Sequence, residues 1–341
     1  MTSVSTTAQR PFSWRLFFQR YGLLLSFFLL CLALTLASDR FLTPENLLNV
    51  LRQSTINGII SVGMMVVILT RGLDLSVGSV LAFATVITAD VLQRGWASFP
   101  VLEPLLGPLL PPEALGQGWP PLPALLFGLA VGGALGLVNG LLVSGGRIPP
   151  FIATLGMMTF ARGLALSYTE GQPITGLPAG FRFIGTGEPA SIPMPVIVAG
   201  VVFLGGYVLL NHTPLGRYIF ALGDNERAAY VSGLATRRLT TLVYVLSGAL
   251  AALAGAILVA RLDSAQPTAG QGFEFDAIAA VVVGGTSFEG GEGTLWGTLV
   301  GVLIIAVLNN GLNLLGVPSF YQGVVKGAVI ALALLLHRAI R

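Results

Sequence analysis

The sequence predicts an all-α membrane protein, a single domain of about ten transmembrane helices, and three observations support this fold class. Apolar residues make up 54% of the 341 residues, and only 18 basic and 15 acidic residues are present. A soluble protein normally has roughly 25% charged residues, against 10% here. The apolar residues also form runs of about 20, the length that a helix needs to cross a hydrocarbon core of about 30 Å.

Charges, prolines and glycine clusters divide the chain into ten apolar segments. In order they are Tyr21–Ser38, Leu47–Leu69, Leu75–Leu92, Leu122–Ser144, Ile148–Tyr168, Met194–Leu210, Leu239–Ala260, Phe275–Ser287, Leu295–Leu315 and Ser319–Leu336. The eighth segment is too short to cross fully, so it is either a broken or tilted helix or it continues into the glycine-rich residues 284–293. Irregular backbone at membrane depth must be covered by protein or water.

The arginines predict the orientation, because cytoplasmic loops retain positive charge. With the N terminus inside, eleven arginines fall on the cytoplasmic side and four outside, namely Arg40, Arg94, Arg182 and Arg261. We therefore expect both termini in the cytoplasm and residues 21–337 as the membrane core. The first segment also has features of a signal peptide, since a basic flank precedes it and it ends in Leu-Ala-Ser. The basic residues form no stripe, so no nucleic-acid partner is expected.

Two pieces of the sequence repeat weakly. Asn139-Gly140-Leu141, followed by two prolines and Phe151, is similar to Asn310-Gly311-Leu312, followed by Pro318 and Phe320. This match predicts inverted repeats, with segments 2–5 corresponding to segments 7–10. A competing match of residues 67–74 with residues 281–289 would make the repeats parallel. Glycine spacing favours the inverted match, because both segments have a stripe that lets helices approach closely: Gly128, Gly132, Gly136 and Gly140, and Gly293, Gly297 and Gly301.

Three charges inside the predicted membrane core need an explanation, because each costs about 2.5 to 3.5 kcal/mol on insertion scales. Asp74 lies where a helix begins, so it is either an N-cap or a substrate ligand. Arg162 lies within snorkelling reach of the outer end of its segment. Lys326, the only lysine, either snorkels, pairs with a carboxylate or neutralises carbonyls of broken helices.

Uncharged polar residues within the segments indicate the class of cargo. Amide side chains offer both donors and acceptors without net charge, which suits a neutral polyhydroxylated solute. Hydrogen bonding between helices is an equally good explanation for any one of them. We expect a translocation path lined by Gln53, Asn57, Asp74, Asn139, Phe151, Asn309, Asn310 and Asn313.

Residue patterns for catalysis are missing from the sequence. No histidine pair has metal-ligand spacing, so no metal site is expected. The phosphate-binding motif Gly-x-x-x-x-Gly-Lys-Ser/Thr requires a lysine followed by serine or threonine, but Lys326 is followed by glycine. We therefore expect no enzyme activity and no cofactor bound by this chain, and any ATP must be hydrolysed elsewhere.

The longest cytoplasmic loop, residues 212–238, contains a short helix signal. Asp224 or Asn225 can cap its start and Gly233 can end it. A helix of two turns is marginal alone, so it must pack against a partner or lie on the bilayer. The small residues Ala228 and Ala229 would face the partner, with Glu226 and Arg227 setting the register.

The motifs of this loop and of three other segments resemble the permease subunits of ribose-type ABC importers. They are Thr213-Pro214-Leu215-Gly216-Arg217 through Gly233, Ile68 through Gly78, Phe151 through Gly156, and Ser264 through Gly285, and the likeness runs from about Phe41 to His337. The proline-rich residues 99–121 are the least similar. The resemblance implies a fold like that of type II ABC importers in a bacterial inner membrane.

The resemblance also implies the partners and the cargo. A second permease, usually a copy of this chain, and two cytoplasmic ATPases that bind ATP and Mg²⁺ would form the complex. A periplasmic binding protein would deliver a neutral monosaccharide, with ribose or a related sugar first. By this analogy the coupling helix that contacts the ATPase consists of Gly223, Asp224, Asn225, Glu226, Arg227, Ala228, Ala229, Val231, Ser232 and Gly233.

Two alternatives stay open. Related families transport branched-chain amino acids or nucleosides, so the sugar is less firmly implied than the mechanism. An ion-coupled secondary transporter would use Asp74 as a protonated or sodium-binding carboxylate.

Overall fold

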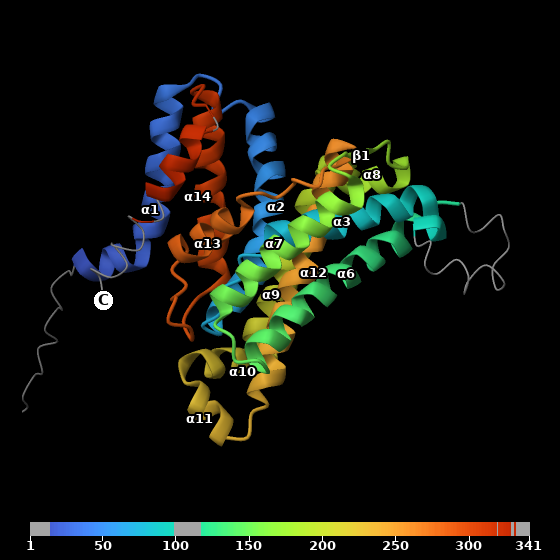
Figure 1. Cartoon of the computed structure of the whole chain (residues 1–341). Helices are drawn as coiled ribbons and strands as arrows, with labels where there is room; N and C mark the ends of the chain where they lie inside the picture. The colour runs from blue at the N-terminus through green and yellow to red at the C-terminus, as the bar shows by residue number, and fades with distance from the viewer. Residues whose placement is uncertain (1–13, 99–116, 319, 329–330, 332–341) are drawn as a thin grey trace, which may run out of the picture.

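The chain folds into a bundle of helices in the computed structural model, which describes residues 14–98, 117–318, 320–328 and 331 (Figure 1). The longer helices are α1 (Trp14–Ala37), α2 (Pro44–Leu69), α3 (Val77–Arg94), α6 (Pro121–Ser144), α7 (Pro150–Thr169), α9 (Met194–His212), α12 (Thr236–Leu262) and α14 (Leu295–Leu314). The shorter elements are η1 (Gly95–Ser98), β1 (Ile174–Thr175), α8 (Ala179–Thr186), η2 (Pro189–Ser191), α10 (Pro214–Asp224), α11 (Glu226–Val231), β2 (Ser264–Ala265) and α13 (Phe273–Val283). Residues 320–328 are also helical.

The all-α membrane fold is confirmed, and within the described residues each predicted segment overlaps a helix. Within the described residues, seven helices are long and apolar enough to span a membrane: α2, α3, α6, α7, α9, α12 and α14. This is fewer than the ten predicted. The apolar part of α1 that is described covers only Gly22–Ala37, α13 has 11 residues, and much of the last predicted segment, like the proline-rich residues 99–116, lies outside the described residues.

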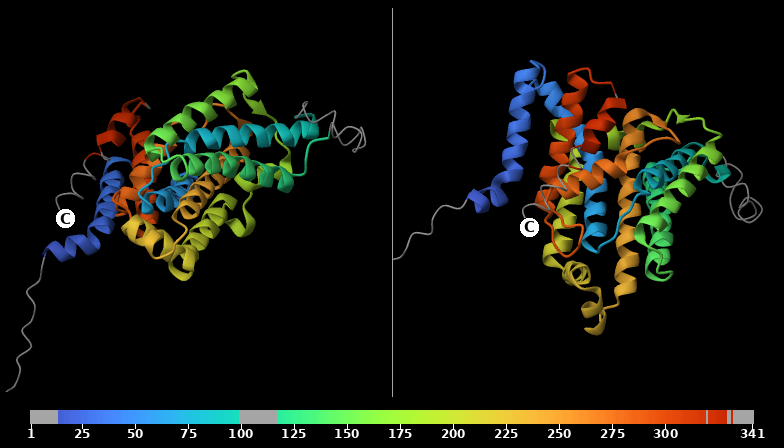
Figure 2. Two further views of the ribbon diagram at one scale, coloured as in Figure 1. Left: turned by 60° about the horizontal axis from the view of Figure 1, so that its bottom comes forward. Right: turned by 60° about the vertical axis from the view of Figure 1, so that its left-hand side comes forward.

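The bundle has two distinct ends. The projecting helices, α10 and α11, extend beyond one end, which we call the α11 end, and β1, β2 and α8 lie at the other, the β1 end (Figures 1 and 2). At the β1 end, β1 pairs antiparallel with β2, and Gln93 Nε2 donates to the carbonyl of Thr175 at 2.6 Å. At the α11 end, the hydroxyls of Ser144 and Thr241 are 2.9 Å apart. The contact between Gln93 and Thr175 agrees with the prediction that the neighbouring Arg94 and Arg182 lie on one side of the membrane. Which end of the bundle faces the cytoplasm stays a prediction.

The core is built around α2. In its most apolar 18-residue window 78% of the residues are buried, against 22% in α9. Ile59, Met64, Met65 and Leu69 are fully buried there. The exposed apolar side chains of α9, such as Val201 and Leu204, suit contact with lipid or another subunit rather than water.

The predicted glycine stripes are sites of close helix packing. A Cβ atom at Gly132 would lie 2.7 Å from the Cβ of Ala252, and one at Gly140 would lie 2.7 Å from the Cα of Thr241, both in α12. Gly297 and Gly301 of α14 likewise come close to Gly284, just after α13, and to Ala280 of α13. Backbones approach this closely only where side chains are missing. Gly293, which the prediction included in this stripe, lies before α14 in residues without regular helix. The inverted-repeat relation itself stays a prediction.

The eighth segment is broken, as one of the two expectations had it. Residues 266–272 precede α13 and residues 284–294 follow it, both without regular helix. Arg162 Nη1 donates to the carbonyls of Pro267 at 2.6 Å and Ala269 at 2.9 Å. The expectation that Arg162 snorkels is therefore corrected, because its guanidinium instead satisfies the irregular backbone before α13. This is the protein coverage that such backbone requires.

Candidate functional site

The projecting helices form the first part of the candidate site. Thr213 caps α10, and Asn225 caps α11 by accepting from the amide of Ala228 at 2.9 Å. Of the two predicted caps it is thus Asn225, not Asp224, that starts α11. Helix α11 ends at the C-cap Ser232, and Gly233 follows in the left-handed region with φ +87°, which a residue without Cβ adopts at little cost.

The surface of α11 differs from the one predicted. Ala229 is buried against its own chain, so it is not free to face a partner. The exposed side chains belong to Glu226, Arg227 and Ala228, and the two most prominent are Tyr230 and Val231, which are 69% and 79% exposed. An apolar tip on a projecting helix is unusual for a surface that faces only water.

A polar cluster inside the bundle, which we call the Asp276 cluster, forms the second part. Lys326 Nζ lies 2.9 Å from both carboxylate oxygens of Asp276. Asn57 of α2 and Asn309 of α14 donate to the same carboxylate at 3.4 and 3.3 Å. Of the three roles considered for Lys326, the structure therefore shows pairing with a carboxylate. Asp276 itself is only 4% exposed.

Each side-chain amide of the Asp276 cluster has a carbonyl oxygen without a hydrogen-bond partner. The Oδ1 atoms of Asn57 and Asn309 are buried and have no hydrogen-bond partner, although both residues are partly exposed as a whole. Buried acceptors of this kind are normally paired. The cluster therefore retains two hydrogen-bond acceptors that no described group satisfies.

A second buried carboxylate, Asp74, is saturated by its own surroundings. Its oxygens accept from the amide and hydroxyl of Ser76 at 3.0 and 2.6 Å and from the hydroxyl of Ser247 at 2.8 Å. Asn139 donates to Ser76 Oγ at 2.9 Å. The side chain of Ser76, the residue before α3, makes no capping hydrogen bond. The carboxylate of Asp74 accepts from the amide of Ser76 instead, as the expected capping role at the start of this helix requires. The contacts join the start of α3 to α6 and α12.

The other predicted path residues lie apart from both clusters. Their hydrogen-bond partners are Asn46 for Asn310, Asn49 for Gln53 and Gln322 for Asn313. Phe151, in the first turn of α7, is 52% exposed at the surface of the chain. The structure therefore brings together Asn57 with Asn309, and Asp74 with Asn139 through Ser76, but not the full predicted set. The role of these residues in a path stays a prediction.

Sequence reasoning did not single out Asp276. It lies one residue inside the eighth predicted segment, so the cost of an intramembrane carboxylate was the signal that would have found it. Among the described residues no group of three or more His, Cys, Asp or Glu residues is placed to hold a metal ion.

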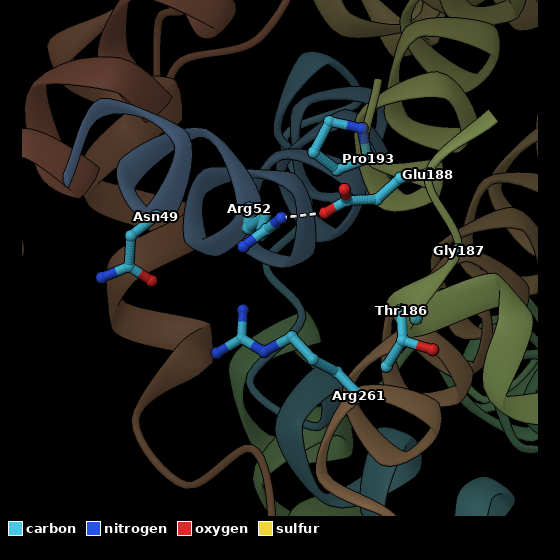
Figure 3. Close-up of a pocket in the computed structure, with 8 residues that line it drawn as sticks. Asn49, Arg52, Thr186, Gly187, Glu188, Pro193 and Arg261 are labelled. Carbon is cyan, nitrogen blue, oxygen red and sulfur yellow. Dashed lines mark hydrogen bonds and ion pairs between the residues drawn. The ribbon is translucent and has the colours of Figure 1, made fainter. Parts of the chain in front are cut away.

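A cavity of about 360 Å³ opens at the β1 end, between the first turns of α2, the loop after α8 and the end of α12. Figure 3 shows Arg52, Arg261 and Asn49 pointing into it, and Arg52 forms an ion pair with Glu188. Arg261 Nη1 is buried without a partner. The cavity is thus lined largely by polar and charged groups.

Comparison with known proteins places the chain in a family. The family model described as branched-chain amino acid transport system / permease component matches residues 46–334. The ribose import permease protein RbsC of Bacillus subtilis (strain 168) is 48% identical over 94% of this chain and 93% of its own length. RbsC of Escherichia coli (strain K12) is 45% identical over 98% of both chains.

The D-allose transport system permease protein AlsC of Escherichia coli (strain K12) is 37% identical over 97% of this chain and 95% of its own length. No solved structure matches the chain significantly. The family model matches most of the chain, and the described residues include seven helices long and apolar enough to span a membrane. The chain belongs to the family of branched-chain amino acid transport system permease components.

Proposed function

We propose that this protein is the transmembrane permease subunit of an ABC importer for ribose or a closely related neutral monosaccharide. The observation that supports this most is the identity of 45–48% to two ribose import permeases, over at least 93% of each chain. Similarity of this extent includes the helices as well as the loops between them. As a permease component, the chain would act in transport and leave catalysis to partner subunits.

Energy reaches the permease through α11. This helix projects from the bundle with Tyr230 and Val231 exposed, which suits insertion into a groove of an ATPase subunit. ATP and Mg²⁺ would be bound by that partner, because the phosphate-binding motif is missing from this chain. The coupling surface then comprises Glu226, Arg227 and Ala228 together with the apolar tip.

The cargo passes the Asp276 cluster rather than Asp74. The Oδ1 atoms of Asn57 and Asn309 are buried and unpaired, so they would accept hydrogen bonds from sugar hydroxyls once the helices around the cluster move apart during transport. The cluster borders on accessible surface through Lys326, whose side chain is 26% exposed. Asp74 is 1% exposed and already accepts three hydrogen bonds. The hydrogen-bond acceptors of Asp74 are therefore largely occupied by groups of the same chain.

The remaining partners follow from the same reading. The permease would act in a bacterial inner membrane with the α11 end and both termini in the cytoplasm. A second copy of the chain would complete the path, and a periplasmic binding protein would deliver the sugar at the β1 end.

The test is uptake of labelled ribose into proteoliposomes that contain this chain, the ATPase and the binding protein. We expect uptake that requires ATP and the binding protein and that unlabelled ribose suppresses. Uptake by the chain alone, driven by a proton or sodium gradient, would instead establish the ion-coupled transporter. A variant with Tyr230→Ala and Val231→Ala tests the coupling surface. It should stay in the membrane and show lower ATP-dependent uptake.

A further inference from the structure

The end of α2 contains an unusual residue. Arg71 follows the C-cap Thr70 and adopts φ +60°, in the left-handed region. Glycine is the usual residue at this position after a helix, because a side chain there is strained. The backbone bonds of the turn are nevertheless regular, with the amide of Arg71 donating to Ile68 at 2.9 Å and that of Gly72 donating to Val67 at 3.0 Å. Arg147 has a similar φ of 55°, so a role for Arg71 has to come from the contacts of its side chain.

That side chain reaches the projecting helices. Arg71 Nε donates to the carbonyl of Gly223 and Nη2 to the carbonyl of Asp224, both at 2.6 Å. These are the last two residues of α10, whose final carbonyls have no partner within the helix. A cation at a helix C-terminus is also favoured by the helix dipole. Arg71 therefore caps α10 immediately before Asn225 starts α11.

A third segment closes the same junction. The amide of Gly291, in residues 284–294 between α13 and α14, donates to the carbonyl of Leu69 at 3.0 Å. A Cβ at Gly291 would lie 2.9 Å from the Cα of Asp224, and one at Gly290 would lie 2.6 Å from Cγ of Arg71. The end of α2, the end of α10 just before α11, and the connection between α13 and α14 thus meet at Arg71, and we call this meeting point the Arg71 junction.

We propose that Arg71 is a positioning residue that couples α11 to α2 and to the connection between α13 and α14, so that a displacement of α11 moves these three helices together. The inference deepens the proposed function, in which α11 receives force from an ATPase. The helices that leave the junction hold Asn57, Asp276 and Asn309. Arg71 contacts none of these three side chains, so its part is mechanical and lies in the coupling of hydrolysis to transport.

The test compares Arg71→Ala with Arg147→Ala. Arg147 is a matched control, because it also lies in a loop at the α11 end with a positive φ of 55°, and the structure shows no hydrogen bond of its side chain to a described residue. In the complete importer, we expect Arg71→Ala to keep the ATPase bound and to lower the ribose transported per ATP hydrolysed at least tenfold. Arg147→Ala should change this ratio less than twofold. Arg71→Lys, which can reach only one of the two carbonyls, should fall between them.

A second measurement does not depend on the proposed function. A spin label at Val231, which is exposed, reports the mobility of α11 in the permease alone. We expect the label to become more mobile in Arg71→Ala than in Arg147→Ala. Equal mobility in the two variants, or an equal ratio of transport to hydrolysis, would overturn the assignment of Arg71. If the unmodified importer did not use ATP, the proposed function would fail while the mobility result still decided the junction.

Discussion

Replacing Lys326 with methionine should destabilise the protein by about 2–3 kcal/mol. Removing one partner of a buried ion pair typically costs about 3–5 kcal/mol, because a charge stays buried without compensation. Asp276 is 4% exposed and meets this condition. The Lys326 side chain is 26% exposed and two amides continue to donate to Asp276, so we expect a value below the full cost. Methionine keeps the apolar stem and removes only the charge and the donors.

A double-mutant cycle separates this effect from a loss of packing. Asp276→Asn removes the other charge, and in the double variant with Lys326→Met no unpaired charge is left. The double variant should therefore be more stable than Lys326→Met alone, with a coupling energy of at least about 1 kcal/mol. Equilibrium unfolding in mixed micelles measures all four proteins. Additive effects of the two substitutions would refute the claim that the pair is buried and coupled.

Three further outcomes follow from the packing and the surface. Gly132→Ala should lower the unfolding temperature in detergent, because the added Cβ has no room against α12. At Gly133 the nearest atom to such a Cβ is 3.7 Å away, so Gly133→Ala should be neutral or stabilising, and equal effects of the two substitutions would count against the glycine stripe. Glu226→Ala with Arg227→Ala should leave membrane insertion intact and lower ATP-dependent uptake, and unchanged uptake in vesicles would remove these side chains from the coupling surface. Asp74→Ala should cost about 2–4 kcal/mol because it leaves three donors unpaired, while Asp74→Asn should cost less; the comparison is made by unfolding in micelles.

The features predicted correctly from the sequence are the local ones. The helical segments follow from apolar runs of membrane length. The start of α11 follows from a capping residue, and its end follows from a terminating glycine. The eighth segment was expected either to be broken or tilted or to continue into residues 284–293, because residues 275–287 are too few to cross the membrane as a helix. The glycine stripe of α6 also depends on the spacing within a single helix.

The features that the sequence did not predict depend on pairing between distant helices. Asp276 and Lys326 are 50 residues apart, and nothing in either segment specifies the other as its partner. The same holds for Arg162, whose acceptors at Pro267 and Ala269 belong to a segment more than 100 residues later. Snorkelling was a reasonable expectation for an isolated helix. In the folded bundle, however, Arg162 lies next to backbone carbonyls that lack a helical partner, and it donates to them instead of extending to the membrane surface.

The position of the Asp276 cluster relative to the Arg71 junction gives the coupling proposal its physical basis. From Asn57 to Leu69 helix α2 rises about 18 Å at 1.5 Å per residue, and its residues there are almost all buried. A helix packed on all sides moves as a unit, because close-packed interiors resist local deformation. A displacement at the junction should therefore reach Asn57 largely undiminished. Since α13 and α14 leave the same junction, Asn57, Asp276 and Asn309 should shift together when α11 is displaced. In the proposed importer, the position of this cluster would therefore follow the movement of the ATPase.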